Sequence, residues 1–169
     1  MYGQLSQSQE NKKILGAKKK VFDGIKFDSN LEVSCYKLLK EDNIIFTYNE
    51  RVIELLPSFR LNKVNYYQSG PKNRGFKQVL TLKGEKLKLP SIKYTPDFII
   101  ETNNNLIIIE TKGFENDVYT YKRKLFFNLL EESIIPKNIY FFEPRTVKQI
   151  KESIIVIKQI LENEVKKNS

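Results

Sequence analysis

The arrangement of hydrophobic and polar positions predicts a β-hairpin near the centre of the chain. Two runs in which every residue is apolar, 98–100 and 106–109, flank a polar segment with three consecutive asparagines. Asparagine tolerates the left-handed backbone that tight turns require, so we place a two-residue loop at Asn103-Asn104. Because the hairpin is apolar on both faces, we expect it in the middle of a sheet.

The open end of this hairpin carries two acids. With the loop in that position, Asp97 faces Glu110, and Lys112 points to the same face as Glu110 because strand side chains alternate. Neighbouring buried carboxylates are unfavourable unless a cation or a proton offsets their charge. A divalent ion held by both acids would do so, and hard oxygen ligands suit Mg²⁺. The alternative is an ion pair in which Lys112 bridges the two acids.

The rest of the chain predicts helices and strands around the hairpin. Apolar residues recur at helical spacing from Asp28-Ser29 to Glu41, and again at 117–132 and 147–165, which predicts three helices. Apolar runs at 44–56 and 139–142 indicate strands. This order predicts an α/β domain with a mixed central β-sheet flanked by helices. The last helix either closes the core or packs on a second subunit. The core positions expected outside the hairpin include Leu31, Cys35, Leu38, Leu39, Ile45, Tyr48, Val52, Ile53, Leu55, Val118, Tyr121, Leu125, Phe126, Leu129, Leu130, Ile150, Ile154, Ile157 and Leu161.

Composition limits the chemistry. A length of 169 residues predicts one domain, and a net charge of +9 indicates a polyanionic partner. The absence of histidine excludes Ser-His-Asp and Cys-His catalysis, and a single cysteine excludes a disulfide framework. No secretory segment or membrane-spanning apolar run is visible, so we expect an intracellular, cytoplasmic protein.

Positive charge is concentrated in two segments. Residues 1–20 form a basic N-terminal arm that either tracks phosphates or is a solvated tail, and the single domain then covers 21–169. Residues 60–90 form a β-rich insertion with eight basic residues and one acid, interleaved with aromatics. This composition suits phosphate neutralisation with base stacking, although a solvated hairpin is the alternative. Three basic residues on the helix at 117–132 either bind DNA or form a solvated face. With them, the residues that we assign to nucleic-acid binding are Lys18, Lys19, Lys20, Arg74, Lys77, Lys122, Arg123 and Lys124.

Pro96-Asp97, followed after twelve residues by Glu110-Thr111-Lys112, resembles the signature of the PD-(D/E)XK nuclease superfamily. Together with the hairpin, the segments 27–32 and 119–126 resemble small phage proteins related to Holliday-junction resolvases, a likeness that covers about residues 21–127. The resemblance implies a restriction-endonuclease-like core. It also implies that Asp97, Glu110 and the Thr111 main-chain carbonyl bind Mg²⁺ or Mn²⁺.

The same resemblance gives Glu32 and Lys112 roles in catalysis. Related nucleases place a glutamate of the first helix beside the metal, which implies that Glu32 completes the metal shell or positions a water. Locally, Glu32 also fits a capping box with Ser29, and that interpretation remains open. The resemblance implies that Lys112 orients the attacking water or stabilises charge on the phosphate.

We therefore expect a metal-dependent DNA endonuclease that hydrolyses phosphodiester bonds, with branched DNA such as a Holliday junction as substrate in DNA recombination. A four-way junction has two equivalent strands to cut, so a homodimer is the expected assembly. One alternative is a non-catalytic nucleic-acid-binding protein on a nuclease-like fold. The other is the endonuclease subunit of a transposase-like complex, which would need recombination or transposition partner proteins.

Overall fold

The computed structural model describes residues 20–69, 75–78, 86–113 and 116–168. Most of the predicted basic arm, with Lys18 and Lys19, and Arg74 of the insertion lie outside the described residues. None of the helices in the described part of the chain is long and apolar enough to cross a membrane.

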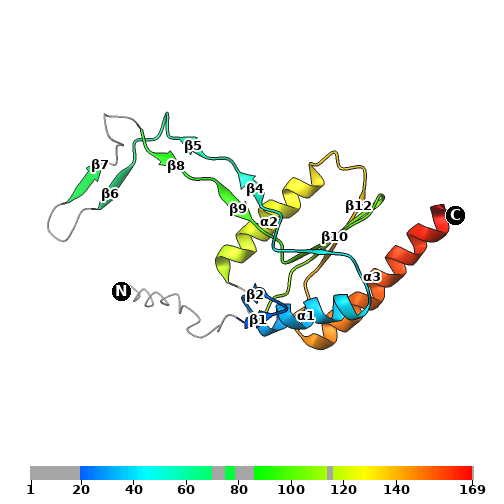
Figure 1. Cartoon of the computed structure of the whole chain (residues 1–169). Coiled ribbons are helices and arrows are strands. Elements are labelled where there is room, and N and C mark those ends of the chain that lie inside the picture. The colour runs from blue at the N-terminus through cyan, green and yellow to red at the C-terminus, as the bar shows by residue number, and fades with distance from the viewer. Residues whose placement is uncertain (1–19, 70–74, 79–85, 114–115, 169) are drawn as a thin grey trace, which may run out of the picture.

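A four-stranded mixed sheet forms the centre of the molecule (Figure 1). Its order is β12 (Asn138–Phe142), β11 (Asn105–Ile109), β10 (Phe98–Glu101) and β3 (Thr47–Tyr48). The pair β11–β12 is parallel, whereas β10 is antiparallel to both of its neighbours. The predicted hairpin supplies the two central strands, which confirms the α/β class with a mixed sheet.

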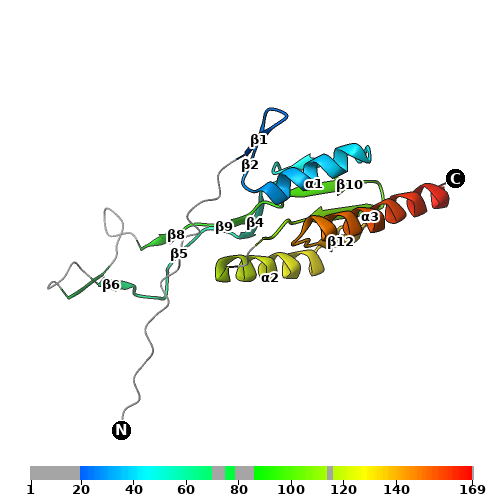
Figure 2. The same ribbon diagram turned by 90° about the horizontal axis from the view of Figure 1, so that it is seen from below.

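Helices cover both faces of the sheet (Figure 2). On one face α1 (Asn30–Glu41) and α3 (Val147–Asn168) pack over Phe98 and Ile107, and on the other α2 (Asp117–Glu131) packs over Ile99 and Ile108. The stripe predicted for the last helix is confirmed, because its residues Ile150, Ile154 and Ile157 are buried. In this chain α3 therefore closes the core.

The register predicted for the hairpin is also confirmed. Phe98 pairs with Ile109 and Ile99 with Ile108, and the Thr102 N–H donates to the Asn105 carbonyl at 2.9 Å, which leaves Asn103 and Asn104 as the loop. At the far end of α3, the Glu164 carboxylate accepts hydrogen bonds from the Thr102 hydroxyl, the Asn104 N–H and the Asn105 side-chain amide. The helix thus holds the turn in place.

The strand predicted at 44–56 is two strands. After β3 the chain turns at Asn49, whose φ is +52°, and leaves the sheet before β4 (Ile53–Leu56) begins. Ile45 is 91% exposed and Val52 is 60% exposed, so the core positions predicted for them are wrong. Both residues lie beside the two-residue edge strand, where no helix covers them.

The core positions predicted for α2 are confirmed in part: Phe126 is buried and Leu130 is partly buried, but the stripe through Val118 and Tyr121 is wrong by one position. The buried residues are Tyr119 and Phe126, whereas Val118 and Tyr121 are 63% and 70% exposed. The other two members of the predicted stripe, Leu125 and Leu129, are also exposed. Two neighbouring apolar stripes run along this helix, and helical spacing alone does not show which of them faces the sheet.

A two-stranded ribbon, formed by the described residues between 53 and 94, projects from the body (Figures 1 and 2). It consists of successive antiparallel pairs: β4 with β9 (Ile92–Tyr94), β5 (Phe59–Arg60) with β8 (Lys88–Leu89), and β6 (Tyr67–Ser69) with β7 (Phe76–Gln78). The described residues of the insertion predicted at 60–90 form the outer part of this ribbon. A second small hairpin, β1 (Lys20–Phe22) and β2 (Ile25–Phe27), turns at Asp23 and Gly24, where both φ angles are positive.

Candidate active site

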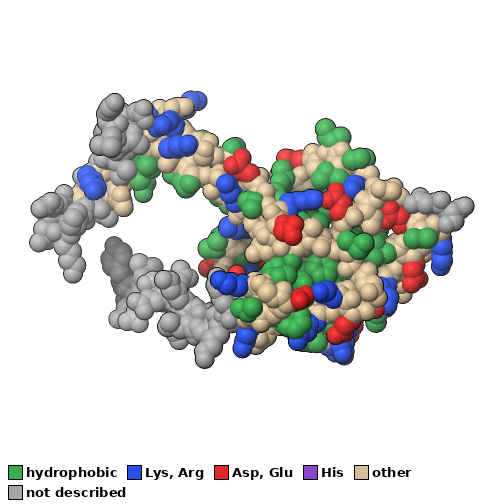
Figure 3. Space-filling model, in the orientation of Figure 1, with side chains coloured by type: hydrophobic (Ala, Val, Ile, Leu, Met, Phe, Trp, Pro, Cys, Tyr) green, Lys and Arg blue, Asp and Glu red, His purple; other side chains and the backbone are tan. Residues whose placement is uncertain are grey.

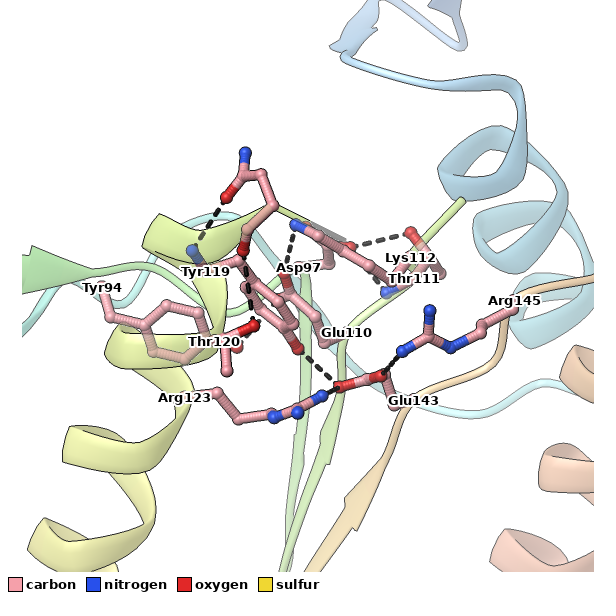
Figure 4. A network of polar contacts seen from close by, with 11 residues as sticks. Tyr94, Asp97, Glu110, Thr111, Lys112, Tyr119, Thr120, Arg123, Glu143 and Arg145 are labelled. Carbon is pink, nitrogen blue, oxygen red and sulfur yellow. Dashed lines mark hydrogen bonds and ion pairs between the residues drawn. The ribbon is translucent and has the colours of Figure 1, made fainter. Parts of the chain in front are cut away.

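Asp97 and Glu110 lie at the same end of the two central strands. Asp97 comes immediately before β10, and Glu110 comes immediately after β11. The Asp97 Oδ2 atom accepts two hydrogen bonds of 2.8 Å, from the Thr111 N–H and from the Thr111 hydroxyl (Figure 4). Both bonds use Oδ2, so they fix the orientation of the Asp97 carboxylate. Oδ1 takes no part in them.

Glu110 is deeply buried, with only 6% of its surface exposed. Its Oε2 atom accepts a 2.8 Å hydrogen bond from the Tyr94 hydroxyl, and its Oε1 atom lies 3.6 Å from the Lys112 ammonium. The Asp97 backbone N–H also faces the Glu110 carboxyl and helps to lower its pKa. The two acids therefore share one hydrogen-bonded cluster, to which Lys112 contributes an ammonium as the sequence predicted.

The electrostatics of this pair favour an added positive charge. Burial, followed by repulsion from Glu110 and Glu32, raises the pKa of Asp97 to about 8. Burial also raises the pKa of Glu110, although hydrogen bonding from Tyr94 and the charge of Lys112 oppose that rise. Lys112 lies within ion-pair distance of Glu110 and not of Asp97, so it does not bridge the acids as the ion-pair alternative requires.

Glu32 makes the contacts of a capping residue. The Ser29 hydroxyl accepts the Glu32 N–H at 3.1 Å, and the Glu32 Oε2 atom accepts the Asp28 N–H at 3.0 Å and the Tyr48 hydroxyl at 2.7 Å. Its charge nevertheless acts on Asp97. Within the described ranges no three Asp, Glu or Cys side chains form a group that fits a metal ion.

A second set of polar contacts surrounds Lys112 (Figure 4). Its ammonium lies 3.9 Å from the centre of the Tyr119 ring, a cation–π contact. The Tyr119 hydroxyl donates to the Glu143 carboxylate at 2.8 Å, which also pairs with Arg123 and Arg145, each at 2.6 Å. Burial would raise the pKa of Glu143, but the hydrogen bonds from Arg123, Tyr119 and Arg145 outweigh it and hold the pKa below the usual value.

The sequence did not identify Tyr94, Tyr119, Glu143 or Arg145 as site residues. Glu143 follows β12, and because β12 runs parallel to β11, both strands end at the edge that carries Glu110. The sequence signal was an acid and a basic residue directly after a buried strand. That signal identifies a site residue only when it is known that β12 pairs with β11, the strand that ends at Glu110.

The predicted basic residues are distributed unevenly. Of the three on α2, Arg123 joins the Glu143 cluster, whereas Lys124 is exposed to solvent. Lys77 is exposed on the ribbon, and Lys20 is exposed at the start of β1. The structure therefore places the predicted nucleic-acid-binding residues that it describes on three separate elements.

Comparison with known proteins finds no matching curated protein. It also finds no matching solved structure. A family model described as "Protein of unknown function (DUF1064)" matches residues 12–134, a segment that contains α1, the ribbon, the central hairpin and α2. Since this match covers well over half of the chain, the protein belongs to the DUF1064 family.

Proposed function

We propose that the protein is a metal-dependent endonuclease that hydrolyses phosphodiester bonds in DNA, on a restriction-endonuclease-like core. Branched DNA, such as a Holliday junction, is the proposed substrate. The observation that carries the proposal is the Asp97–Glu110 pair at one end of the central hairpin, in which Glu110 is buried and Asp97 is half-buried, with Lys112 beside it. A fold gains nothing from such a pair unless a ligand offsets its charge.

The residues present fit a divalent ion. Mg²⁺ keeps several waters and needs only one or two carboxylates, so Asp97 and Glu110 with the Thr111 main-chain carbonyl would be sufficient to hold Mg²⁺ or Mn²⁺. The raised pKa values of both acids, caused first by burial, favour exchange of a proton for a cation. When bound, such an ion supplies a water of lowered pKa and offsets the charge that develops on the phosphate.

The side chains of the protein would do the remaining work. Lys112, held between Glu110 and the Tyr119 ring, would donate a hydrogen bond to the attacking water or to a phosphate oxygen and stabilise its negative charge. Thr111 fixes the orientation of Asp97 through its N–H and its hydroxyl. Glu32 uses Oε2 for its two hydrogen bonds, so its role in the proposal is to position a water near Asp97.

Two alternative functions explain the positive net charge of the chain equally well. A binding protein on the same fold, or the endonuclease subunit of a transposase-like complex, would also carry a net charge of +9. A pure binding protein gives no reason to bury two acids at the end of its central strands. A subunit of a larger complex would keep the site but cut DNA only with its partner proteins.

The test is cleavage of labelled junction, flap, duplex and single-stranded DNA with Mg²⁺, Mn²⁺, Ca²⁺ or EDTA. We expect Asp97→Asn to reduce cleavage on the order of a thousandfold or more, since the loss of metal-ion stabilisation costs several kcal/mol. Lys112→Ala should also lose cleavage while metal still binds, and Lys151→Ala, an exposed lysine of α3, is the matched control.

Melting temperature and DNA affinity of the same preparations complete the test. Asp97→Asn should bind DNA at least as well as the wild type, because one negative charge near the phosphates is removed. If Asp97 served only stability, activity would fall only in proportion to the folded protein. The enzyme proposal fails if the wild type cuts nothing with Mg²⁺ or Mn²⁺ and Asp97→Asn binds DNA as the wild type does.

A further inference from the structure

The ribbon has two chemically different faces where β5 pairs with β8. Arg60 is paired with Lys88 and Phe59 with Leu89, and paired residues of an antiparallel ladder lie on the same face. Strand side chains alternate between faces, so Lys86 lies on the face of Arg60 and Lys88. One face is therefore basic and the other apolar.

The apolar face continues beyond β5 and β8. The Leu61 N–H donates to the Leu87 carbonyl at 3.0 Å, which extends the pairing and places these two leucines on the face of Phe59. Phe59 remains 45% exposed. The alternation of aromatic and basic residues in the sequence thus separates them onto opposite faces in this part of the ribbon.

Positive charge is largely unbalanced along the ribbon (Figure 3). In the parts of it that the structure describes, the single acid is Glu54, which lies opposite Lys93. The Arg60 guanidinium donates to the Lys86 carbonyl and the Lys86 ammonium to the Asn62 carbonyl, so both cations are anchored to the backbone. The basic residues of the described ribbon are Arg60, Lys63, Lys77, Lys86, Lys88 and Lys93.

The ribbon is continuous with the strand that carries the candidate site. β9 ends at Tyr94, whose hydroxyl binds Glu110, and Asp97 follows three residues later. Lys88 lies six residues before Tyr94 in the sequence. At about 3.3 Å per extended residue this separation is at most about 20 Å, which corresponds to roughly six base pairs of duplex.

We propose that the basic face formed by Arg60, Lys86 and Lys88 holds duplex DNA on the ribbon, up to about 20 Å from Tyr94, whose hydroxyl contacts Glu110 of the candidate site. The nuclease then needs a duplex flank of about six base pairs or more on one side of the bond that it cuts. The part of this inference that concerns cleavage rests on the proposed function. The part that concerns DNA binding rests on the ribbon alone.

Two features favour a duplex over a single strand. A single-strand platform combines stacking rings and cations on one surface, whereas Phe59 lies on the face opposite Arg60 and Lys88. The major groove of a duplex admits a two-stranded ribbon, and the phosphates beside the groove suit a row of lysine and arginine side chains.

The experiment compares the full-length wild type with the double variant Arg60→Ala/Lys88→Ala. Affinity for a long labelled duplex and for a single strand of equal length is measured in EDTA by fluorescence anisotropy over a range of salt concentrations. We expect the slope of log K against log salt to fall by about two on duplex, at about 0.9 per lost phosphate contact. A double variant of exposed α3 lysines, Lys151→Ala/Lys166→Ala, should leave that slope unchanged, and Arg60→Lys/Lys88→Arg should bind as the wild type does.

A slope unchanged in Arg60→Ala/Lys88→Ala, or an equal loss on single-stranded DNA, would overturn the inference. In Mg²⁺, cleavage of stem-loop substrates should drop once the duplex flank falls below about six base pairs. If cleavage does not depend on flank length, the inference is also overturned. The salt-dependence slopes are measured in EDTA and do not depend on cleavage. If the wild type binds DNA through the ribbon but never cuts it, the proposed function alone is refuted. A wild type that cuts with an unchanged slope in the ribbon variant refutes this inference alone.

Discussion

Each acid of the candidate site has partners that fix its position without removing its electrostatic cost. Asp97 receives two neutral hydrogen bonds from Thr111, and Glu110 receives one from Tyr94. Lys112 is the one cation within ion-pair distance of either acid among the residues that the structure describes. Fixed geometry combined with unbalanced charge is the arrangement expected of a site prepared for a cation.

Glu143 shows the opposite behaviour, because two arginines and a tyrosine satisfy it. We expect Glu143→Gln to lower the free energy of unfolding by about 1–3 kcal/mol at neutral pH, since the partly buried Arg123 and the exposed Arg145 lose a charged partner. The pKa of Glu143 is lowered in the folded protein, so its contribution is present above the unfolded value of about 4.3 and is lost as the pH falls through the folded pKa. Urea denaturation of both proteins from about pH 7 to about pH 3 measures the difference, with exposed Glu162→Gln as control. A difference that persists undiminished in acid would contradict this role.

The two interpretations of Glu32 are separable by a pair of variants. Ser29→Ala removes the helix cap and should cost about 1 kcal/mol of stability without changing cleavage per folded molecule. Glu32→Gln keeps an oxygen that can accept from Tyr48 and the Asp28 N–H, so stability should change little. Loss of the charge should lower cleavage about 10- to 100-fold. Cleavage equal to that of the wild type in both variants would leave capping as the whole role of Glu32.

At the scale of elements, the position of α2 decides which side chains reach the site. Its N-cap Asn116 accepts the Tyr119 N–H, and the Tyr119 ring then packs beneath Lys112 while Arg123, one turn later, reaches Glu143. A rotation of the helix by one residue would bury Val118 instead and remove both contacts. The orientation of α2 is therefore coupled to the candidate site.

Neighbouring residues of α2 test that orientation. Phe126→Ala should cost about 3–5 kcal/mol, because its fully buried ring leaves a cavity between the helix and the sheet. Leu125→Ala should cost less than about 1 kcal/mol, because Leu125 is exposed. Thermal denaturation should show a loss on the order of 10 °C for Phe126→Ala and a small change for Leu125→Ala. Equal losses would mean that the helix is rotated from the position described here.

At the scale of the whole molecule, a compact body and a projecting ribbon meet at the candidate site. β4 and β9, the strands at the base of the ribbon, pack against α2 through Ile53 and Tyr94. A long polyanion would thus contact two parts of one chain, the ribbon and the edge of the sheet. This division suits a macromolecular substrate.

A two-fold dimer makes a further prediction for the proposed junction substrate. Two copies bound to one junction would place two sites on two equivalent strands. A supercoiled plasmid with an extruded cruciform should therefore become linear in a single binding event, as shown by gel electrophoresis. Mixed dimers of wild type and Asp97→Asn should yield nicked circles instead. If nicked circles precede linear product with wild type at every protein concentration, the active unit is a monomer.

Features that depend on local pattern could be predicted from the order of the amino acids. The register of the central hairpin follows from two apolar runs and a pair of asparagines, and it placed Asp97 opposite Glu110 with Lys112 on the same face. The stripe of α3, with Ile150 and Ile157, was predicted equally well because its apolar residues recur at helical spacing over several turns. Local periodicity and turn residues are sufficient to predict a strand register or a helix face wherever one register or face is much more favourable than the alternatives.

Tertiary structure decided what depends on distant partners. The parallel pairing of β12 with β11 brought Glu143 to the site, and the choice between two apolar stripes of α2 brought Tyr119 under Lys112. The pairing of β5 with β8 separated Phe59 from Arg60 onto opposite faces. These outcomes depend on which surfaces pack together, and the free energy of that packing comes from burial shared between segments far apart in the chain, which no local pattern contains.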